Sequence, residues 1–313
     1  MHIFGESYAG RYIPVFTEYL LHMNDQLEQS EDLRQRGFRH LPLRGIGIGN
    51  GLFDYALQAP SYYKMGCRSS YPPMFNARQC STLKNTVNPQ CISMLAQCYA
   101  SNQEQSSEGM RQEGCVGIEL ERWRLTDACA AADSYCNGAL NWTTPASTYD
   151  VRQGARIVPD DYVSLLRTNA FVEAVGASPT VMYQECSDSV FDLFASTTDE
   201  ISRSAKSSLE YILSRQLPVL LYSGDADFIC NWYGTVTVAK ALEWQGKSRF
   251  ANARINNWSW PAKNGTNVPA GQFLNADNLT FLRVYEAGHE VPFYQPEASL
   301  FMLMQFVTQR RLY

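Results

Sequence analysis

Long apolar runs, an excess of basic charge and closely spaced cysteine pairs are all missing from this chain of 313 residues. The longest purely apolar runs, such as Val219–Leu221, are far too short to cross a bilayer, so we expect no membrane span. With 31 acidic against 26 basic residues and no Lys/Arg cluster, the chain lacks the basic footprint that a nucleic-acid partner requires. No C-x-x-C pair is present, and we therefore expect no metal site and no cofactor.

A secretory leader is missing as well, because no charged stretch, apolar segment or small-residue cleavage site follows Met1. The nine cysteines, in contrast, indicate a protein of the secretory pathway. Seven of them fall between positions 67 and 136 at irregular spacings, which favours a disulfide-rich segment and an oxidising compartment. Sequons for N-glycosylation agree with this, at Asn141, Asn257, Asn264 and Asn278. A secretory cysteine pattern without a leader predicts that a segment upstream is missing.

The hydrophobic fraction of 45% excludes a disordered chain, and the pattern of apolar residues predicts a single α/β domain that carries an insertion. We expect core residues at 1–66 and 206–313, with a cap or insertion at 67–205 that is disulfide-rich at 67–136. Apolar runs predict strands at 2–4, 43–48, 218–222 and 279–285. Helical spacing predicts helices at 12–26, 160–175, 204–215, 232–244 and 296–306, the first starting near Pro14 because proline interrupts a helix interior.

The segment Gly5–Gly10 (GESYAG) lies directly after a predicted strand and before a predicted helix. This is the setting of a nucleophile elbow, a tight turn that presents a serine, here Ser7, above a sheet. The strict pattern G-x-S-x-G has glycine where this chain has Ala9, a small residue that still allows close packing. The alternative is an ordinary glycine-rich turn between a strand and a helix.

A serine hydroxyl needs a base to take its proton, and α/β-hydrolases supply the partners in the order Ser, Asp, His. His289 follows a predicted strand in a loop bounded by glycine and proline, which makes it the candidate base. The other histidines fit structural or solvated positions better, namely His2, His22 and His40. The strand at 218–222 runs into two acids, Asp225 and Asp227, and spacing alone does not choose between them.

Several strings resemble the signature segments of the serine carboxypeptidases, in the same order along the chain: Gly5–Tyr12, Gly49–Leu52, Gly224–Trp232 and Gly288–Pro292. The resemblance runs through the cysteine-rich region and is greatest to fungal vacuolar members of that family. It implies an α/β-hydrolase fold, N-terminally incomplete, with a disulfide-rich and mainly helical cap insertion. It also implies Ser7 as the nucleophile and His289 as the general base and then acid. Asp227 would orient the base, since the family's acid precedes a cysteine by three residues, here Cys230.

The resemblance implies further site residues. Tyr8 would donate its backbone N–H to the oxyanion. Glu6 matches a glutamate in the network that holds the substrate's terminal carboxylate; because such a pair shares a proton, one pKa is raised and an acid optimum is expected. Cys230 resembles a free thiol near the substrate pocket, and the alternative is a buried small hydrophobic residue. Glu290 stands where many relatives carry methionine, and we expect it to lie near the leaving residue and to favour a basic one.

The cysteine pairing is also implied by the resemblance: Cys67–Cys80, Cys91–Cys136 and Cys98–Cys129. Cys115, Cys186 and Cys230 would stay unpaired, because the family partner of Cys186 lies in a segment before the nucleophile strand. That segment also supplies the second oxyanion N–H and the partner of Glu6. These departures predict an incomplete gene model or a truncated product.

The leading hypothesis is a serine-type carboxypeptidase that releases C-terminal residues from peptides or proteins through an acyl-enzyme on Ser7. One alternative is a truncated, catalytically impaired fragment of such an enzyme. Another is an acyltransferase on the same scaffold, which is disfavoured because Glu6 retains the peptidase-type carboxylate site. The resemblance implies a vacuolar or secreted location.

Overall fold

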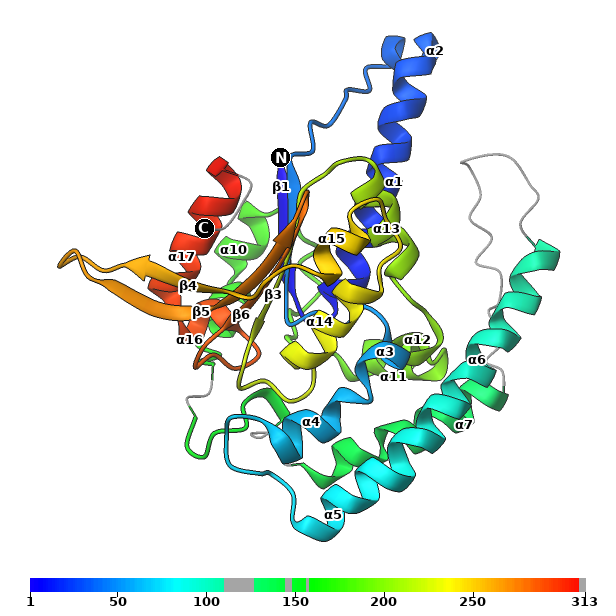
Figure 1. The fold of residues 1–313 in the computed structure, drawn as a ribbon. Helices are drawn as coiled ribbons and strands as arrows, with labels where there is room; N and C mark the ends of the chain where they lie inside the picture. The colour runs from blue at the N-terminus through cyan, green and yellow to red at the C-terminus, as the bar shows by residue number, and fades with distance from the viewer. Residues whose placement is uncertain (110–126, 144–147, 156–157, 310–313) are drawn as a thin grey trace.

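The fold is built on a six-stranded sheet at the centre of the molecule (Figure 1). The computed structural model describes residues 1–109, 127–143, 148–155 and 158–309. The strand order is β1-β2-β3-β6-β5-β4. The bounds are β1 His2–Glu6, β2 Gly45–Gly49, β3 Val219–Gly224, β4 Asn256–Pro261, β5 Asn267–Ala276 and β6 Leu279–Val284.

The sheet is mixed, and its parallel part positions the site. Strands β1, β2, β3 and β6 are parallel neighbours, whereas β5 and β4 continue the sheet as an antiparallel hairpin. In a parallel sheet the carboxyl ends of the strands meet at one edge, where ligands commonly bind. The loops that follow β1, β3 and β6 carry Ser7, Asp227 and His289, so the topology brings these loops to the same edge.

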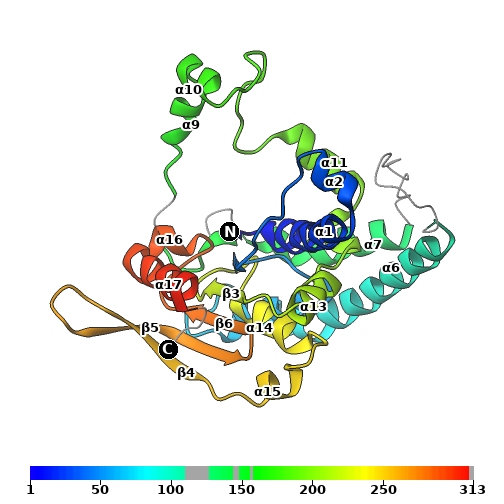
Figure 2. The same ribbon diagram turned by 90° about the horizontal axis from the view of Figure 1, so that it is seen from above.

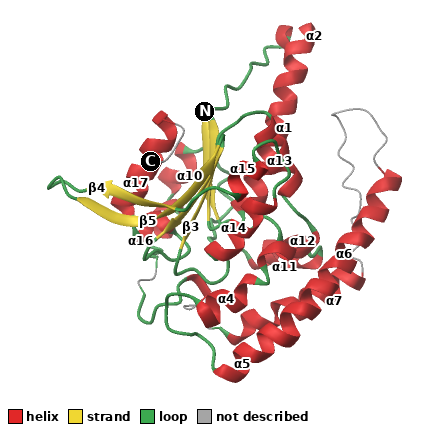
Figure 3. Cartoon of the chain, viewed as in Figure 1, coloured by secondary structure: helices red, strands yellow, loops and turns green. Residues whose placement is uncertain are grey.

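Helices cover both faces of the sheet (Figures 1 and 3). One face packs against α1 (Ala9–Gln29), α13 (Lys206–Ser214) and α14 (Trp232–Ala241), and the other against α17 (Pro296–Gln309). Successive residues of a strand point to opposite faces. Accordingly Leu221 belongs to the cluster under α1 and α13, and Leu220 to the cluster under α17. Because both faces of β3 are covered, all of its residues are buried, which explains its continuous apolar run.

A helical region follows β2 and contains its own core. Its elements are α3 Tyr55–Gln58, α4 Ser61–Arg68, α5 Ala77–Thr82, η1 Leu83–Val87, α6 Asn88–Gly109, α7 Asp127–Cys136 and η2 Asn137–Trp142. Three disulfides cross-link this region, with the pairing that the family resemblance implies: Cys67–Cys80, Cys91–Cys136 and Cys98–Cys129. Cys230 is free and buried, and Cys186 is free and exposed. Cys115 lies outside the described residues.

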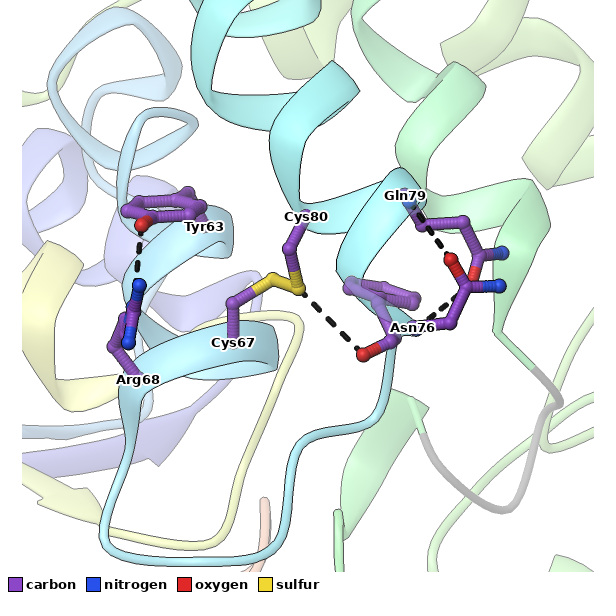
Figure 4. The surroundings of a disulfide bond; sticks show 7 residues. Tyr63, Cys67, Arg68, Asn76, Gln79 and Cys80 are labelled. Atoms are coloured by element: carbon purple, nitrogen blue, oxygen red, sulfur yellow. Dashed lines mark hydrogen bonds between the residues drawn. A yellow bond between two sulfur atoms is a disulfide. The ribbon is translucent and has the colours of Figure 1, made fainter.

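The first disulfide lies where α4 meets α5, as Figure 4 shows. Helix α5 begins with a capping box, in which Asn76 accepts from the backbone N–H of Gln79 and the Gln79 side chain accepts from that of Asn76. This reciprocal pair satisfies two otherwise orphaned donors at the helix start. The cap and the disulfide together fix the short helix that carries Cys80.

Helix α1 starts earlier than the sequence predicts. It begins at Ala9, and Pro14 lies inside it. The expected start near Pro14 is therefore wrong. A proline costs a helix one backbone hydrogen bond, but here Pro14 is buried with Ile13 on the face that packs against the core, and tertiary packing outweighs the local propensity.

Two other helical predictions are corrected, and one hairpin was not predicted. The helix expected over 160–175 is two short helices, α9 (Tyr162–Leu166) and α10 (Asn169–Ala174), because Thr168 caps a new start. The helix expected over 232–244 ends at Ala241, and α15 follows at Lys247–Ala251. Figure 2 shows α9 and α10 projecting from the rest of the chain, and neither buries a residue. The β4–β5 hairpin lacks strict apolar alternation, which is why it was missed.

The remaining helices are short: α2 Glu31–Gln35, α11 Asp188–Ser196, α12 Asp199–Ser202 and α16 Val291–Tyr294. Helix α12 packs against α6, α7 and α3 of the helical region. It is also linked to the core helix α1, because the Arg11 guanidinium donates to the Glu200 carbonyl (2.8 Å). Among the described residues, no helix is both long and apolar enough to span a membrane.

Candidate active site

The turn after β1 has the strained geometry of a nucleophile elbow. Ser7 has a φ of 62°, in the left-handed region that side-chain-bearing residues rarely adopt. Its N–H donates to the Gly49 carbonyl (3.0 Å), and its carbonyl accepts from the N–H groups of Gly10 and Leu52 (3.0 Å each). A Cβ on Gly10 would lie 2.4 Å from the Leu52 carbonyl oxygen, so only glycine fits there. These bonds hold Ser7 in the turn despite its strained backbone.

Ala9 is tolerated in place of the expected glycine because it faces a glycine. A Cβ on Gly5 would lie 2.8 Å from the Ala9 Cβ. The two positions therefore share one small space between β1 and α1, and a single methyl group fills it. The departure from the strict motif is thus compensated within the same turn.

Tyr8 lies at the N-terminus of the long helix α1. Within the described part of the chain its backbone N–H has no hydrogen-bond partner, which leaves this donor available at the positive end of the helix dipole. Its hydroxyl donates to Asp199 Oδ2 (2.6 Å), and its ring contacts those of Tyr12 and Phe194. These contacts fix the residue next to Ser7 from the side of α11 and α12.

The acid and base loops meet in the buried interior. His289 Nδ1 lies 2.9 Å from Asp227 Oδ2, although 62 residues separate them in sequence. Asp227 is completely buried and His289 is 5% exposed. Asp227 also accepts from the backbone N–H groups of Ile229 and Cys230 (3.2 Å each) and from the Asn50 side chain (2.7 Å). These bonds fix the position of the carboxylate against the imidazole.

The charge state of the imidazole follows from its neighbours. Burial lowers the pKa of His289, but the negative charges of Asp227, Glu6 and Glu290 together raise that pKa above its ordinary value. The Tyr149 ring lies 4.9 Å from the imidazole ring, centroid to centroid. Such an imidazole gains a proton readily and holds it next to a buried carboxylate, as a general base requires.

The structure shows which of the two acids, Asp225 or Asp227, contacts His289, a choice that their spacing in the sequence did not decide. Asp225 accepts from the Tyr71 hydroxyl (2.6 Å), from the Arg283 guanidinium (2.9 Å) and from the Glu286 backbone N–H (2.9 Å). It therefore ties β3, β6 and the helical region together. Asp227 is the acid that contacts the imidazole.

The segment that follows η2 holds the base loop, a role that the sequence did not predict. The Tyr149 carbonyl accepts from the His289 N–H (2.9 Å), and the Arg152 guanidinium donates to the Glu286 carbonyl (2.9 Å). Arg152 is itself paired with buried Asp150. These contacts span more than a hundred residues, so no local pattern of residues indicates them.

Glu6 lies beside the base loop. The pKa of Glu6 is raised to about 7: burial is the largest cause and the charge of Glu290 acts in the same direction, whereas His289, the Tyr222 hydroxyl and the Val291 backbone N–H act to lower the pKa. The carboxyl group therefore holds a proton below neutral pH. The raised pKa expected for Glu6 arises here from burial first, with Glu290 as the neighbouring carboxyl.

The other two predicted substrate residues, Glu290 and Cys230, lie in the base loop and in the acid loop respectively. Burial raises the pKa of Glu290, as does the charge of Glu185. One oxygen of Glu290 is buried and has no hydrogen-bond partner among the described residues. The Cys230 thiol is buried in the cluster of Tyr62 and Phe228, and burial raises its pKa. Its backbone, in contrast, helps to hold Asp227.

The predicted triad residues are thus brought together in part. Asp227 and His289 are in hydrogen-bonding contact, and Ser7 lies at the end of β1, directly after Glu6, whose charge acts on His289. The Ser7 hydroxyl has no hydrogen-bond partner among the described residues. Bonds of this kind are often long in an unliganded site and tighten when substrate binds. The described residues also contain no group of three or more side chains suited to a metal ion.

The sequons differ in how their side chains are used. Asn141, Asn257 and Asn264 are exposed. Asn264 lies in the turn between β4 and β5, where its side-chain oxygen accepts from the Thr266 hydroxyl (2.7 Å). Asn278 is different: it is half-buried, and its amide nitrogen donates to the carbonyls of Leu213 and Leu217.

Comparison with known proteins identifies the family. A family model described as serine carboxypeptidase matches residues 1–309. Carboxypeptidase S1 of Penicillium janthinellum is 31% identical over 98% of this chain and 66% of its own length. Carboxypeptidase Y homolog A of Ajellomyces capsulatus is 34% identical over 96% of this chain and 49% of its own length. The chain therefore spans about half to two thirds of these relatives.

The fold comparison agrees. The structure of Kex1(delta)p, a prohormone-processing carboxypeptidase from Saccharomyces cerevisiae, matches with a TM-score of 0.61 at 19% identity. The match covers 99% of this chain and 62% of that one. The fold is that of the α/β hydrolases, with a disulfide-linked helical region.

Proposed function

The chain belongs to the serine carboxypeptidase family, and from this premise we propose that it hydrolyses the C-terminal peptide bond of peptides through an acyl-enzyme on Ser7. The observation that carries the proposal is the buried contact of 2.9 Å between His289 and Asp227, at the sheet edge where Ser7 occupies its strained turn. A buried acid–imidazole pair of this kind can take the proton of a serine hydroxyl placed next to it, which supports the proposal.

In the proposed mechanism His289 Nε2 takes the proton of the Ser7 hydroxyl as its oxygen attacks the scissile carbonyl carbon. Asp227 holds the imidazole through Nδ1 and stabilises the positive charge that forms. The Tyr8 N–H donates to the oxyanion. The imidazolium then protonates the leaving amine, and the acyl-enzyme is hydrolysed by a water that His289 deprotonates in turn.

Selectivity for chain ends follows from the carboxyl group of Glu6. In its protonated form Glu6 donates a hydrogen bond to the substrate's terminal carboxylate, and its raised pKa of about 7 supports that form in acid. The proposed enzyme thus works best below neutral pH. Glu290, beside the leaving residue, would favour a basic side chain there, because its charge attracts a cation.

The disulfides support a location on the secretory route, because such bonds persist in oxidising compartments. We propose the vacuole or the exterior of the cell on this basis. The division into core residues 1–66 and 206–313 around an insertion at 67–205 belongs to the same proposal.

A pair of matched substrates tests the activity. An N-blocked dipeptide with a free C-terminal carboxylate should lose its last residue, whereas the same dipeptide with an amidated C-terminus should react far more slowly. The Ser7→Ala variant should release nothing. Equal rates on both substrates, or release by Ser7→Ala, would contradict a carboxypeptidase mechanism on this serine.

A further inference from the structure

We propose that Asn50 is a positioning residue that fixes Asp227, the acid of the triad, against the turn that carries Ser7. The inference rests on the function proposed above and deepens it. Asn50 directly follows β2 and is completely buried. No role follows for it from its place in the sequence, because its partners lie more than 170 residues away.

Every polar position of the Asn50 side chain is in use. Its Nδ2 donates to Asp227 Oδ2 (2.7 Å) and to the Cys230 carbonyl (3.3 Å), and its Oδ1 accepts from the Gly224 N–H (2.9 Å). The amide can have only this orientation, because a reversed amide would set two donors against each other at Gly224 and two acceptors at Asp227. The side chain therefore joins the end of β3 to both ends of the acid turn.

The backbone around Asn50 holds the nucleophile turn. The Gly49 carbonyl, directly before it, accepts from the Ser7 N–H, and the Leu52 N–H, two residues after it, donates to the Ser7 carbonyl. Asn50 itself has a φ of 38°, in the left-handed region, which asparagine tolerates better than most residues. The segment Gly49–Leu52 thus bonds to Ser7 through its backbone and to Asp227 through the Asn50 side chain.

The contact also affects the imidazole. Asp227 Oδ2 accepts both from Asn50 and from His289. A donor on this oxygen offsets part of its negative charge, and so moderates its pull on a protonated imidazole. The other charged groups that act on His289 are the carboxyls of Glu6 and Glu290, and neither contacts Asn50. Losing the Asn50 donor should therefore raise the pKa of His289 through Asp227 alone.

Two variants of Asn50 test the effect of its side-chain amide apart from the effect of its left-handed backbone conformation. Asn50→Gly keeps the backbone conformation and removes the whole side chain, and with it the donor to Asp227. Asn50→Ala also removes the amide without adding a charge, which provides a second test if Asn50→Gly does not fold. The matched control is Asn24→Ala, since Asn24 is also buried and also makes two side-chain hydrogen bonds, both to the backbone of Leu41.

The experiment measures kcat and KM on the dipeptide and the pKa of His289 by NMR of its ring protons, which is practical with four histidines in the chain. Both Asn50 variants should lower kcat by about ten- to a hundredfold, as for the loss of a hydrogen bond to a charged group, with KM little changed. Both should raise the pKa of His289, whereas Asn24→Ala should change neither.

The pKa measurement separates this inference from the proposed activity, because it needs no turnover. A raised His289 pKa in Asn50 variants of a chain that does not cleave peptides would support the positioning role and contradict the proposed function. An unchanged His289 pKa in a folded Asn50 variant, with a loss of kcat no larger than that of Asn24→Ala, would overturn the positioning role.

Discussion

Asp225 and Asp227 lie two residues apart in one loop, yet they bind groups of different kinds. Asp225 holds the Arg283 guanidinium and the Tyr71 hydroxyl, whereas Asp227 contacts the His289 imidazole. A shift of two positions along the loop thus exchanges an acid that bonds to Arg283 and Tyr71 for one that contacts the imidazole.

This difference predicts opposite effects for one substitution. Asp227→Asn should lower kcat by about 10⁴-fold, because an amide at this place favours the wrong imidazole tautomer. Asp225→Asn should lower stability by about 3 kcal/mol, because it leaves the buried part of Arg283 without its counter-charge. Peptide assays and urea unfolding of both variants measure this. The reverse assignment, with Asp225→Asn the inactive and stable variant, would contradict it.

Glu200 predicts how stability changes with pH. Its pKa is raised from 4.5 to about 7, by burial first and then by the charge of Asp133, while Arg11 acts to lower the pKa. Because the folded-state pKa is the higher one, this contribution to stability is complete below about pH 4.5 and is lost as the pH rises through about 7. Glu200→Gln should resemble wild type in acid and be more stable by about 3 kcal/mol above pH 8, at about 1.4 kcal/mol per pKa unit.

Urea unfolding at a series of pH values tests this, with Glu173→Gln as the control on an exposed glutamate. The control should follow wild type throughout. If Glu200→Gln also followed wild type at every pH, the buried carboxyl would have no part in the pH dependence.

Glu6 predicts how substrate binding changes with pH. As its carboxyl loses a proton near pH 7, it turns from a donor into a negative charge facing the substrate's carboxylate, and KM should rise about tenfold per pH unit above that point. Glu6→Gln keeps a donor at all pH values, so its KM should stay flat. A KM that rises equally in both proteins would assign the effect to another group.

The sequons predict which asparagines carry glycan when the protein passes through a secretory pathway. Asn264 is exposed at a hairpin turn and should be modified, whereas the amide nitrogen of Asn278 donates to two backbone carbonyls and should not be. Peptide mass spectrometry after enzymatic deglycosylation in heavy-oxygen water distinguishes the sites. Glycan on Asn278 and none on Asn264 would contradict the expected difference.

Local signals in the sequence predicted much of the fold and part of the site. The continuous apolar run of β3 and the turn at Ser7 have clear patterns over a few residues, and both were predicted from them. The start of α1 at Ala9 was missed because buried packing of Pro14 overrides its propensity. The helix expected over 160–175 is divided at Thr168, where a side-chain cap competes with helix continuation.

The supporting contacts of the site were beyond such reasoning. Asn50 was noticed only as part of a string that resembles the family, and Arg152 was not noticed. Both act through hydrogen bonds to residues more than a hundred positions away. No periodicity or spacing rule reports such a pair, because it exists only once the sheet brings the strand ends together.

The most direct test of the central claim is whether Ser7 is an activated nucleophile. A fluorophosphonate probe reacts with a serine whose proton is taken by a base, and mass spectrometry then locates the adduct. We predict labelling of the purified chain at Ser7, loss of that labelling in His289→Ala, and full labelling in the exposed-serine control Ser196→Ala. A folded chain whose Ser7 stays unlabelled, or is labelled equally in His289→Ala, would contradict the account.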